Sequence, residues 1–408
     1  MEEKKLGVYI HLPFCADKCM YCDFYSLSGQ KKLIPRYHAA LLNHIEETAP
    51  RMEQYYIDTL YFGGGTPSYY GAKRICQIFD ALKRHAQVLK SAEVTVEVNP
   101  DSISRRDLKI LKNEGVNRIS LGVQSANDEI LRMIGRRHNF KQAEQAVKWI
   151  RGAGFDNLSI DLIYGLPSQN KGDWADTLTK ALALRPEHFS CYGLKLEENV
   201  PMYEYKGTEG LPNEDAQADM YLYMTDTLEH YGYPQYEISN FAMRGRQSKH
   251  NLKYWNLDDF MGFGPGAHSY VDGVRYSFTR NLEGYINGVL EGKNIIDEYE
   301  KTGKPERAAE YIMLGMRTVK GISKEEYSSI YRSGFERLEY LLAEYEKKGW
   351  TQRKADRWSF TSAGFLLSNI LTGTLLEAQS HEKLSANPWI RSSSAKIQIF
   401  EDDQDFEL

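Results

Sequence analysis

Three cysteines lie within eight residues near the start of the chain, in the run Cys-Ala-Asp-Lys-Cys-Met-Tyr-Cys. The spacing of Cys15, Cys19 and Cys22 suits three corners of a cubic iron–sulfur cluster, whereas a closed cluster of that kind takes four cysteine ligands. One iron would then stay open to an exchangeable ligand, and the amino and carboxylate groups of S-adenosylmethionine are suitable donors. The loop therefore predicts a site for radical chemistry.

Two other uses of clustered cysteines are weaker interpretations of this spacing. Zinc takes four ligands, usually from two C-x2-C pairs or from one such pair with two histidines, and a spacing of three followed by two fits neither pattern well. Disulfides need an oxidising compartment, but residues 1–6 are charged and precede only a short apolar strand, unlike a secretory signal. The loop alone thus favours an iron–sulfur site.

Composition limits the number of domains, the cellular compartment and the partners to be expected. With 408 residues and 42% hydrophobic content, the chain can bury a large core in one large and one smaller domain. The remaining cysteines, Cys76 and Cys191, lie in apolar runs, which predicts a reduced, cytoplasmic protein. A net charge of -5 gives no reason to expect nucleic acid, and no apolar run is long enough to span a bilayer.

Short apolar runs alternate with amphipathic stretches along the first half of the chain. The predicted strands cover residues 8–10, 59–62, 94–98, 119–123, 158–163 and 188–192. The predicted helices cover residues 37–52, 72–85, 105–113, 141–153 and 174–184. Six β-α units in series predict an α/β fold, a partial (β/α)6 TIM-like barrel with ligands at the carboxyl ends of its strands.

The pattern divides the chain into four segments. Residues 1–200 are expected to form the core barrel and residues 201–300 to complete it. Residues 301–373 combine helices with the strand-like run Trp-Ser-Phe-Thr at 358–361, which predicts a small, mostly helical, winged-helix-like domain that lacks a basic recognition helix. Residues 374–408 become Ser-rich and then acidic, with no periodic apolar face, and are expected to be a disordered tail.

Polar and glycine residues gather where the predicted strands end. The run Phe-Gly-Gly-Gly-Thr-Pro-Ser at 62–68 would let a ligand lie on exposed backbone groups, although a tight turn uses the same residues. Glu97, Gln124 and Asp161 follow at successive strands, and Arg136 adds a cation for a ligand carboxylate. Any one of them alone is more commonly a satisfied buried polar group, but three at one barrel mouth favour a binding site.

Together these motifs resemble the radical S-adenosylmethionine family that contains the oxygen-independent coproporphyrinogen III oxidases and the HemW heme chaperones. The resemblance runs from about residue 9 to about residue 371 and also includes Tyr-Ile-His-Leu-Pro-Phe at 9–14 and Ile-Asp-Leu-Ile-Tyr-Gly-Leu-Pro at 160–167. It implies a radical SAM barrel and a 4Fe-4S cluster held by Cys15, Cys19 and Cys22. It also implies S-adenosylmethionine contacts from Tyr9, Tyr21, Gly64, Gly65, Thr66, Glu97, Gln124, Arg136, Asp161 and His268.

Two departures favour the heme chaperone branch of that family. The oxidases resemble C-x3-C-x2-C-x-C and have a long segment before the loop, whereas here Asp23 and Phe24 follow Cys22 and fourteen residues precede Cys15. Residues 249–255, Lys-His-Asn-Leu-Lys-Tyr-Trp, resemble the His-Asn-x-x-Tyr-Trp signature of the chaperones. That likeness implies heme contacts; the alternative is that the first two residues of the signature cap a turn and its tryptophan is core. The implied heme residues are His250, Asn251, Tyr254 and Trp255.

The resemblance implies a heme chaperone that binds the cluster, S-adenosylmethionine and heme and transfers heme to an acceptor protein. An electron donor is implied if the cluster is reduced. The alternative from the same family is radical decarboxylation of coproporphyrinogen III to protoporphyrinogen IX, and no catalytic residue is assigned for it. His250 is the leading axial ligand, because an imidazole can ligate heme iron; His11, His138 and His268 come next.

Overall fold

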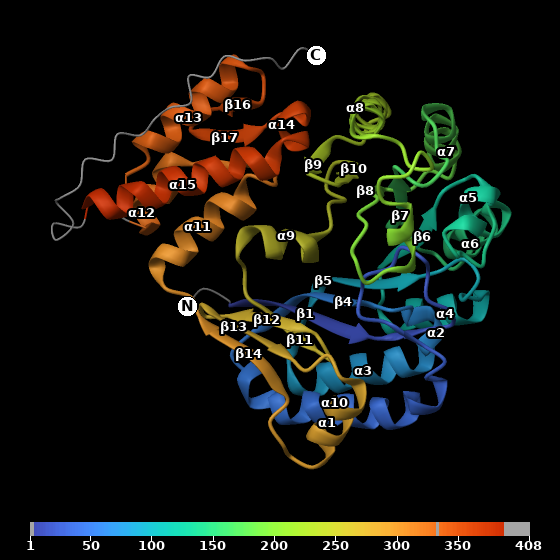
Figure 1. Ribbon diagram of the computed structural model, residues 1–408. Coiled ribbons are helices and arrows are strands. Elements are labelled where there is room, and N and C mark those ends of the chain that lie inside the picture. Colours follow the sequence, from blue (N-terminus) through green and yellow to red (C-terminus); the bar gives the residue numbers. More distant parts are fainter. Residues whose placement is uncertain (1–3, 332–333, 387–408) are drawn as a thin grey trace.

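The computed structural model describes residues 4–331 and 334–386, and the environment of side chains as far as residue 380. A large sheet of twelve strands forms the frame of this part of the chain (Figure 1). Its centre is a run of adjacent parallel strands, and each of the six strands expected from sequence is present. These are β1 (Lys5–Leu12), β4 (Tyr56–Gly64), β5 (Gln87–Val98), β6 (Arg118–Gln124), β7 (Leu158–Tyr164) and β8 (His188–Gly193).

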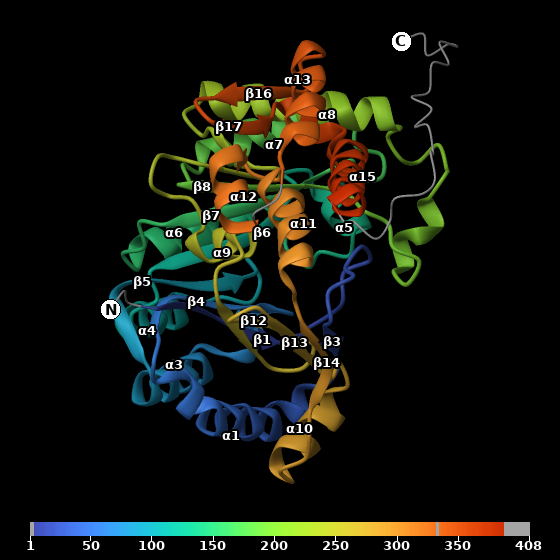
Figure 2. The ribbon, with the colours of Figure 1, turned by 90° about the vertical axis from the view of Figure 1, so that its left-hand side faces the viewer.

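Helices connect these strands, and all five expected ones are present. Capping fixes several of their ends: the Ser104 side chain accepts a hydrogen bond from Asp107 N at the start of α4, and Gly115 ends that helix with a φ of 111°. Figure 2 shows α1 and α3 on the outer side of the strands. The helices are α1 (Ile34–Met52), α3 (Ala72–His85), α4 (Arg105–Glu114), α6 (Phe140–Gly152) and α7 (Lys171–Ala183), with the short α2 (Pro67–Tyr70) and α5 (Asp128–Met133) between them.

The parallel strands are extended on both sides by antiparallel ones. On one side β11 (Phe260–Phe263) pairs in parallel with β1 and continues into three antiparallel strands. On the other side two short strands follow β8. The two ends of the strand order do not pair with each other among the described residues, so the barrel is partial. The added strands are β12 (His268–Val271), β13 (Val274–Phe278), β14 (Ile296–Lys301), β10 (Asn240–Ala242) and β9 (Gln235–Glu237).

Two short strands and several helices complete this part of the fold. A two-stranded pair holds the start of the cysteine loop, and α9 lies between the large sheet and the C-terminal helices (Figure 1). No helix in residues 4–331 and 334–386 has the length and apolar character that a membrane crossing requires. These elements are β2 (Phe14–Cys15), β3 (Leu27–Ser28), α8 (Glu214–His230), α9 (Lys249–Asn256), α10 (Leu282–Leu290) and the 3-10 helices Lys31–Leu33 and Pro201–Tyr205.

The C-terminal part packs helices against a three-stranded sheet, as expected for a winged-helix-like unit. The structure differs from the sequence-based expectation at its end, because α15 (Ser368–Ala386) runs through the expected start of a disordered tail. Leu371, Leu375 and Gln379 lie on one face of α15 and are buried, so this stretch has an inward face; residues 387–408 lie outside the described residues. The other elements are α11 (Lys304–Gly315), β15 (Ile322–Ser323), α12 (Lys324–Tyr331), α13 (Glu336–Lys347), β16 (Thr351–Lys354), β17 (Arg357–Phe360) and α14 (Ser362–Leu366).

Candidate functional site

A cavity of about 470 Å³ opens at the carboxyl ends of the parallel strands. Its position agrees with the general rule that ligands of parallel α/β sheets bind beyond the strand ends. The three cysteines of the loop lie on its wall, so residues from β1, the loop and β4 to β7 converge on one space. The sequence-predicted residues that line it are Tyr9, Cys15, Cys19, Tyr21, Cys22, Gly64, Gly65, Thr66, Glu97, Gln124, Arg136, Asp161 and Asn251.

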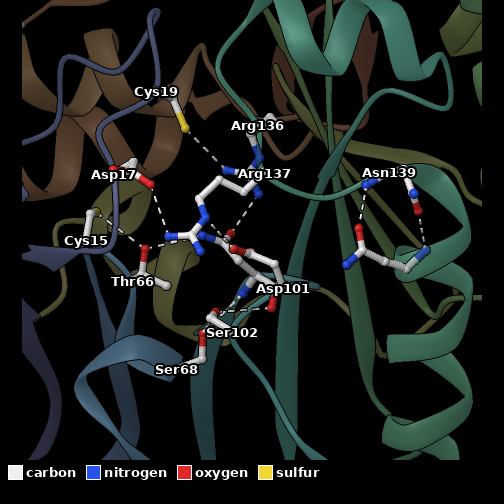
Figure 3. Close-up of polar contacts among 12 residues, drawn as sticks. Cys15, Asp17, Cys19, Thr66, Ser68, Asp101, Ser102, Arg136, Arg137 and Asn139 are labelled. Atoms are coloured by element: carbon white, nitrogen blue, oxygen red, sulfur yellow. Dashed lines mark hydrogen bonds and ion pairs between the residues drawn. The ribbon is translucent and has the colours of Figure 1, made fainter.

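Each cysteine sulfur has a polar neighbour supplied by the protein. The Thr66 hydroxyl donates to Cys15 Sγ at 3.4 Å, and Arg136 Nη1 donates to Cys19 Sγ at 3.7 Å (Figure 3). Cys22 Sγ lies 3.9 Å from Ser26 Oγ. Burial raises the pKa of the Cys15 and Cys22 thiols. A bound metal cation would reverse that preference, because its charge favours the thiolate.

The glycine run joins β4 to the cysteine loop. Gly65 N donates to Leu12 O at 2.9 Å, and Thr66 N donates to Phe14 O at 2.9 Å. A Cβ on Gly65 would lie 2.8 Å from Leu12 O, and one on Gly64, which has a φ of 109°, would lie 2.6 Å from the His11 ring. The glycines are therefore needed for close packing of the loop onto the strand, in addition to any contact with a ligand.

Two half-buried carboxyl groups line the same cavity as the cysteines. Tyr61 OH donates to Glu97 Oε1 at 2.8 Å, and Gly64 N donates to Glu97 Oε2 at 3.3 Å. Burial raises the pKa of Glu97 to about 7. Ser120 Oγ donates to Asp161 at 3.0 Å, and burial raises the pKa of Asp161 as well. Both groups can accept hydrogen bonds from hydroxyl groups of a ligand.

Arg136 links the cysteine loop to two strand ends. Its Nη2 donates to Gly122 O at 2.6 Å and to Asn99 Oδ1 at 2.8 Å. Gln124, which ends β6, has a φ of 69°, an uncommon value for a residue with a side chain. Arg137, the residue after Arg136, forms ion pairs with two acidic side chains (Figure 3): Asp17 of the loop at 3.0 Å and Asp101 at 3.4 Å.

The residues predicted to contact heme are placed differently. His250 is 1% exposed and does not line the cavity. Its Nδ1 shares a 2.8 Å hydrogen bond with Thr59 Oγ1, and its Nε2 shares one of 2.8 Å with Tyr254 OH. The ring also stacks against Tyr9 and Tyr61. In this conformation neither imidazole nitrogen is free to bind a metal.

Other predicted residues lie outside the cavity. Tyr254 is occupied by its bond to His250, and Trp255 is half-buried beyond the cavity wall. His268 is exposed at the start of β12 and does not line the cavity. Of the histidines next in order as heme ligands, His11 shares a hydrogen bond with Tyr25 O at 2.8 Å, while the buried His138 Nδ1 has no hydrogen-bond partner among the described residues.

Several cavity residues were not predicted from the sequence, among them Tyr61, Asn99 and Arg118. Strand β6 carries a signal that identifies Arg118, because positions 118, 120, 122 and 124 share one face of a strand and are polar or glycine. Asn99 has a weaker signal, its place directly after the end of β5. Tyr61 has none, since a tyrosine inside an apolar run equally suits a core position.

The donor set fits a multi-atom cluster better than a single ion. Among residues 4–331 and 334–386, no three His, Cys, Asp or Glu side chains gather closely enough to hold one metal ion. A cubane presents a separate iron to each cysteine and places no such demand on the thiols. The loop supplies three cysteines on one wall of a cavity, which matches the donor number for a cluster with one open iron.

Comparison with known proteins places the fold and the family. The radical SAM superfamily matches residues 9–181, and the HemN C-terminal domain matches residues 304–367. The solved structure of coproporphyrinogen III oxidase (HemN) from Escherichia coli aligns with a TM-score of 0.81 at 24% identity, over 91% of this chain and 90% of that one. At that identity the likeness shows the fold alone, and it confirms the predicted fold class.

Relatives at higher identity cover nearly the whole chain. The heme chaperone HemW of Bacillus subtilis is 36% identical over 378 residues, which cover 91% of this chain and 99% of the relative. The HemW proteins of Lactococcus lactis and Escherichia coli are 34% and 33% identical, each over 90% of this chain and 97% of the relative. The chain therefore belongs to the HemW family, within the radical SAM superfamily.

Proposed function

We propose that this protein is a heme chaperone of the cytoplasm, which binds a 4Fe-4S cluster, S-adenosylmethionine and heme and passes heme to an acceptor protein. One observation carries the proposal: cysteines, glycines and half-buried carboxyls surround one cavity, in a chain that is 36% identical to the Bacillus subtilis heme chaperone over 91% of its length. The acceptor, and a donor of electrons if the cluster is reduced, are the expected protein partners.

Cys15, Cys19 and Cys22 would hold the cluster. When bound, such a cluster supplies one-electron chemistry toward S-adenosylmethionine at its open iron. Thr66 and Arg136 already donate hydrogen bonds to two of the sulfurs, and donors of this kind stabilise thiolate ligands.

S-adenosylmethionine would occupy the cavity beside the cluster. Glu97 and Asp161 would accept hydrogen bonds from its hydroxyl groups, because both carboxyls face the cavity and neither has an ion-pair partner within 4.0 Å among the described residues. Gly64 and Gly65 bring backbone close to the same space, where carbonyl groups suit the amine of the ligand.

Heme would bind near α9, with His250 as the leading axial ligand and Asn251, Tyr254 and Trp255 around it. Because both nitrogens of His250 are engaged by Thr59 and Tyr254, ligation through this ring requires α9 to release it. Asn251 already lines the cavity one residue away, so a small shift of α9 would open a path between the two regions.

Anaerobic purification with iron, acid-labile sulfide and heme quantified together tests the proposal. We expect about four irons and four sulfides per chain after reconstitution, and saturable binding of heme that is lost on addition of an acceptor. Material devoid of iron and sulfide after reconstitution would contradict the cluster assignment. Anaerobic incubation with coproporphyrinogen III, S-adenosylmethionine and a low-potential reductant is the second arm. Many turnovers to protoporphyrinogen IX would support the oxidase in place of the chaperone.

A further inference from the structure

Arg118 is a buried cation on the wall of the cavity that none of the roles above uses. It opens β6, is 2% exposed, and is among the largest fully buried side chains of the described residues. Alternate side chains of a strand point to the same face. Arg118 therefore shares a face of β6 with Ser120 and Gln124, and it lies farther than both from the carboxyl end of the strand. Its side chain therefore reaches the cavity from a position nearer the strand starts than Glu97, which pairs with Ser120.

The guanidinium of Arg118 has no close partner of opposite charge. Its Nε has no hydrogen-bond partner, and no carboxylate lies within 4.0 Å of the group among the described residues. Glu93 and Asp161 act on it only as more distant charges. The hydroxyl of Thr95, the cross-strand neighbour of Arg118, is also buried without a partner. Two buried polar atoms without a hydrogen-bond partner among the described residues thus belong to paired positions of β5 and β6, and Arg118 lines the cavity.

Burying a charged side chain without a partner costs free energy. Buried charges in proteins are therefore usually paired with an opposite charge or with a ligand. Arg151 shows how this chain satisfies an arginine that serves the fold alone. Its two terminal nitrogens donate to both oxygens of Glu187, each at 2.9 Å, outside the cavity. Arg118 has the same fork of donors, directed into a cavity and without that carboxylate.

We propose that Arg118 binds a carboxylate of the ligand in this cavity. The planar guanidinium donates two parallel hydrogen bonds and matches a carboxylate better than any other common anion of similar size except a phosphate. Under the proposed function, on which this inference rests, the carboxylate has two possible sources: a propionate of heme or the aminoacyl group of S-adenosylmethionine. The chemistry is the same for both, and ligand binding can tell them apart.

The test measures three affinities of the cluster-reconstituted protein: for heme, for heme dimethyl ester and for S-adenosylmethionine. The ester keeps the macrocycle but lacks both carboxylates. Wild type is compared with Arg118→Gln, which removes the charge, and Arg118→Lys, which keeps a charge without the fork. Arg151→Gln is the control, because it loses a half-buried arginine pair outside the cavity.

We expect Arg118→Gln to weaken one carboxylate ligand by roughly 10–100-fold, the range for a hydrogen bond to a charged group, and Arg118→Lys to recover part of that loss. Affinity for the ester should stay within about twofold of wild type. A loss confined to heme assigns the propionate, and a loss confined to S-adenosylmethionine assigns the aminoacyl carboxylate.

Two results overturn the inference: unchanged affinity for all three ligands, or an equal loss that includes the ester, which would show a change of cavity shape. If Arg118→Gln does not fold, Arg118→Lys alone decides between them, since its ammonium cannot replace a bidentate contact. Failure of the proposed function looks different, because wild type itself would then bind neither heme nor S-adenosylmethionine.

Discussion

The cysteine loop and helix α9 carry the two most distinctive motifs of the chain, and they present their side chains in opposite ways. The three thiols line a cavity, and each has a long side-chain contact of 3.4 to 3.9 Å. His250 of α9 faces inward and has both ring nitrogens in hydrogen bonds of 2.8 Å. A motif thus shows which residue types occur together, while packing decides which of them a ligand can reach.

Several interactions hold α9 against the large sheet. The Ser248 side chain caps its first turn, and Glu93 Oε1 accepts a hydrogen bond from His250 N at 3.1 Å. Lys253 of the same helix pairs with Asp58 of β4 at 2.8 Å. Burial lowers the pKa of His250 to about 3, so the ring is neutral at physiological pH. The cysteine loop has no comparable set of short side-chain bonds at its sulfurs, which leaves the sulfurs available.

Changing a loop cysteine should have the largest effect. Cys19→Ala removes one of three ligands, so iron and sulfide per chain should fall at least about tenfold after reconstitution. The measurement is metal and sulfide analysis together with the visible absorption of the cluster. Cys76→Ala is the matched control, because Cys76 is a buried cysteine on α3, remote from the loop. Full cluster content in Cys19→Ala would remove the contrast between the two regions.

His250→Ala tests the packing of α9. Loss of the ring leaves Thr59 and Tyr254 without their partner and empties the space between Tyr9 and Tyr61, so unfolding free energy should fall by about 3–5 kcal/mol. Urea denaturation measures this change. The exposed His268 is the control, and His268→Ala should change stability by less than about 0.5 kcal/mol.

The heme spectrum of the same variant sharpens the comparison. If His250 is the axial ligand, the Soret band of His250→Ala should shift or disappear, while His268→Ala keeps the wild-type band. A destabilised His250→Ala protein with an unchanged Soret band would instead make this residue purely structural and move the ligand elsewhere.

Glu97→Gln tests the cavity through the pH dependence of stability. Burial raises the pKa of Glu97 from 4.5 to about 7, so the folded state binds a proton that the unfolded state has lost. The contribution of Glu97 to stability should therefore be greatest below pH 4.5 and should fall by up to about 3 kcal/mol as pH rises to 7. Stability curves from pH 4.5 to 7.5 should be flatter for Glu97→Gln by that amount.

The control for this prediction is Glu237, whose pKa burial also raises to about 7, but which does not line the cavity. Glu237→Gln should flatten the curve similarly. Saturating S-adenosylmethionine should then change the pH dependence of wild type and of Glu237→Gln, but not that of Glu97→Gln. Identical ligand effects in both variants would argue against a contact with Glu97.

The smallest effect is expected from Arg137→Gln. Arg137 bridges Asp17 of the loop and Asp101, but its side chain is 54% exposed and that of Asp17 is 66% exposed. Exposed ion pairs contribute about 0–1 kcal/mol, so stability and cluster content should change little. Loss of more than half of the cluster would show that this pair, rather than the glycine contacts, fixes the loop.

The regular half of the fold could be predicted from sequence because its strands are apolar and its helices amphipathic. The antiparallel additions could not. Strand β14 is exposed along its whole length and alternates no apolar residues, and β12 lies within a glycine-rich stretch. Their pairing depends on contacts with strands distant in sequence, which no local pattern encodes.

The candidate site divides in the same way. Strand-end residues such as Glu97 and Gln124 could be predicted, because the carboxyl ends of parallel strands meet at one edge. The engagement of His250 by Thr59 could not, since 191 residues separate them and only the folded sheet brings them together. Arg118 was missed although its strand face carries a polar pattern, because a charge at the beginning of a strand usually points to solvent.

The position of β1 has a consequence for synthesis of the protein on the ribosome. This strand pairs with β4 on one edge but with β11, at residues 260–263, on the other. At about 5–20 residues per second, the second partner emerges from the translating ribosome roughly 10–50 s after the first strand. During that interval the nascent chain exposes an unpaired, apolar strand edge to neighbouring nascent chains on the same message, and it needs protection from aggregation.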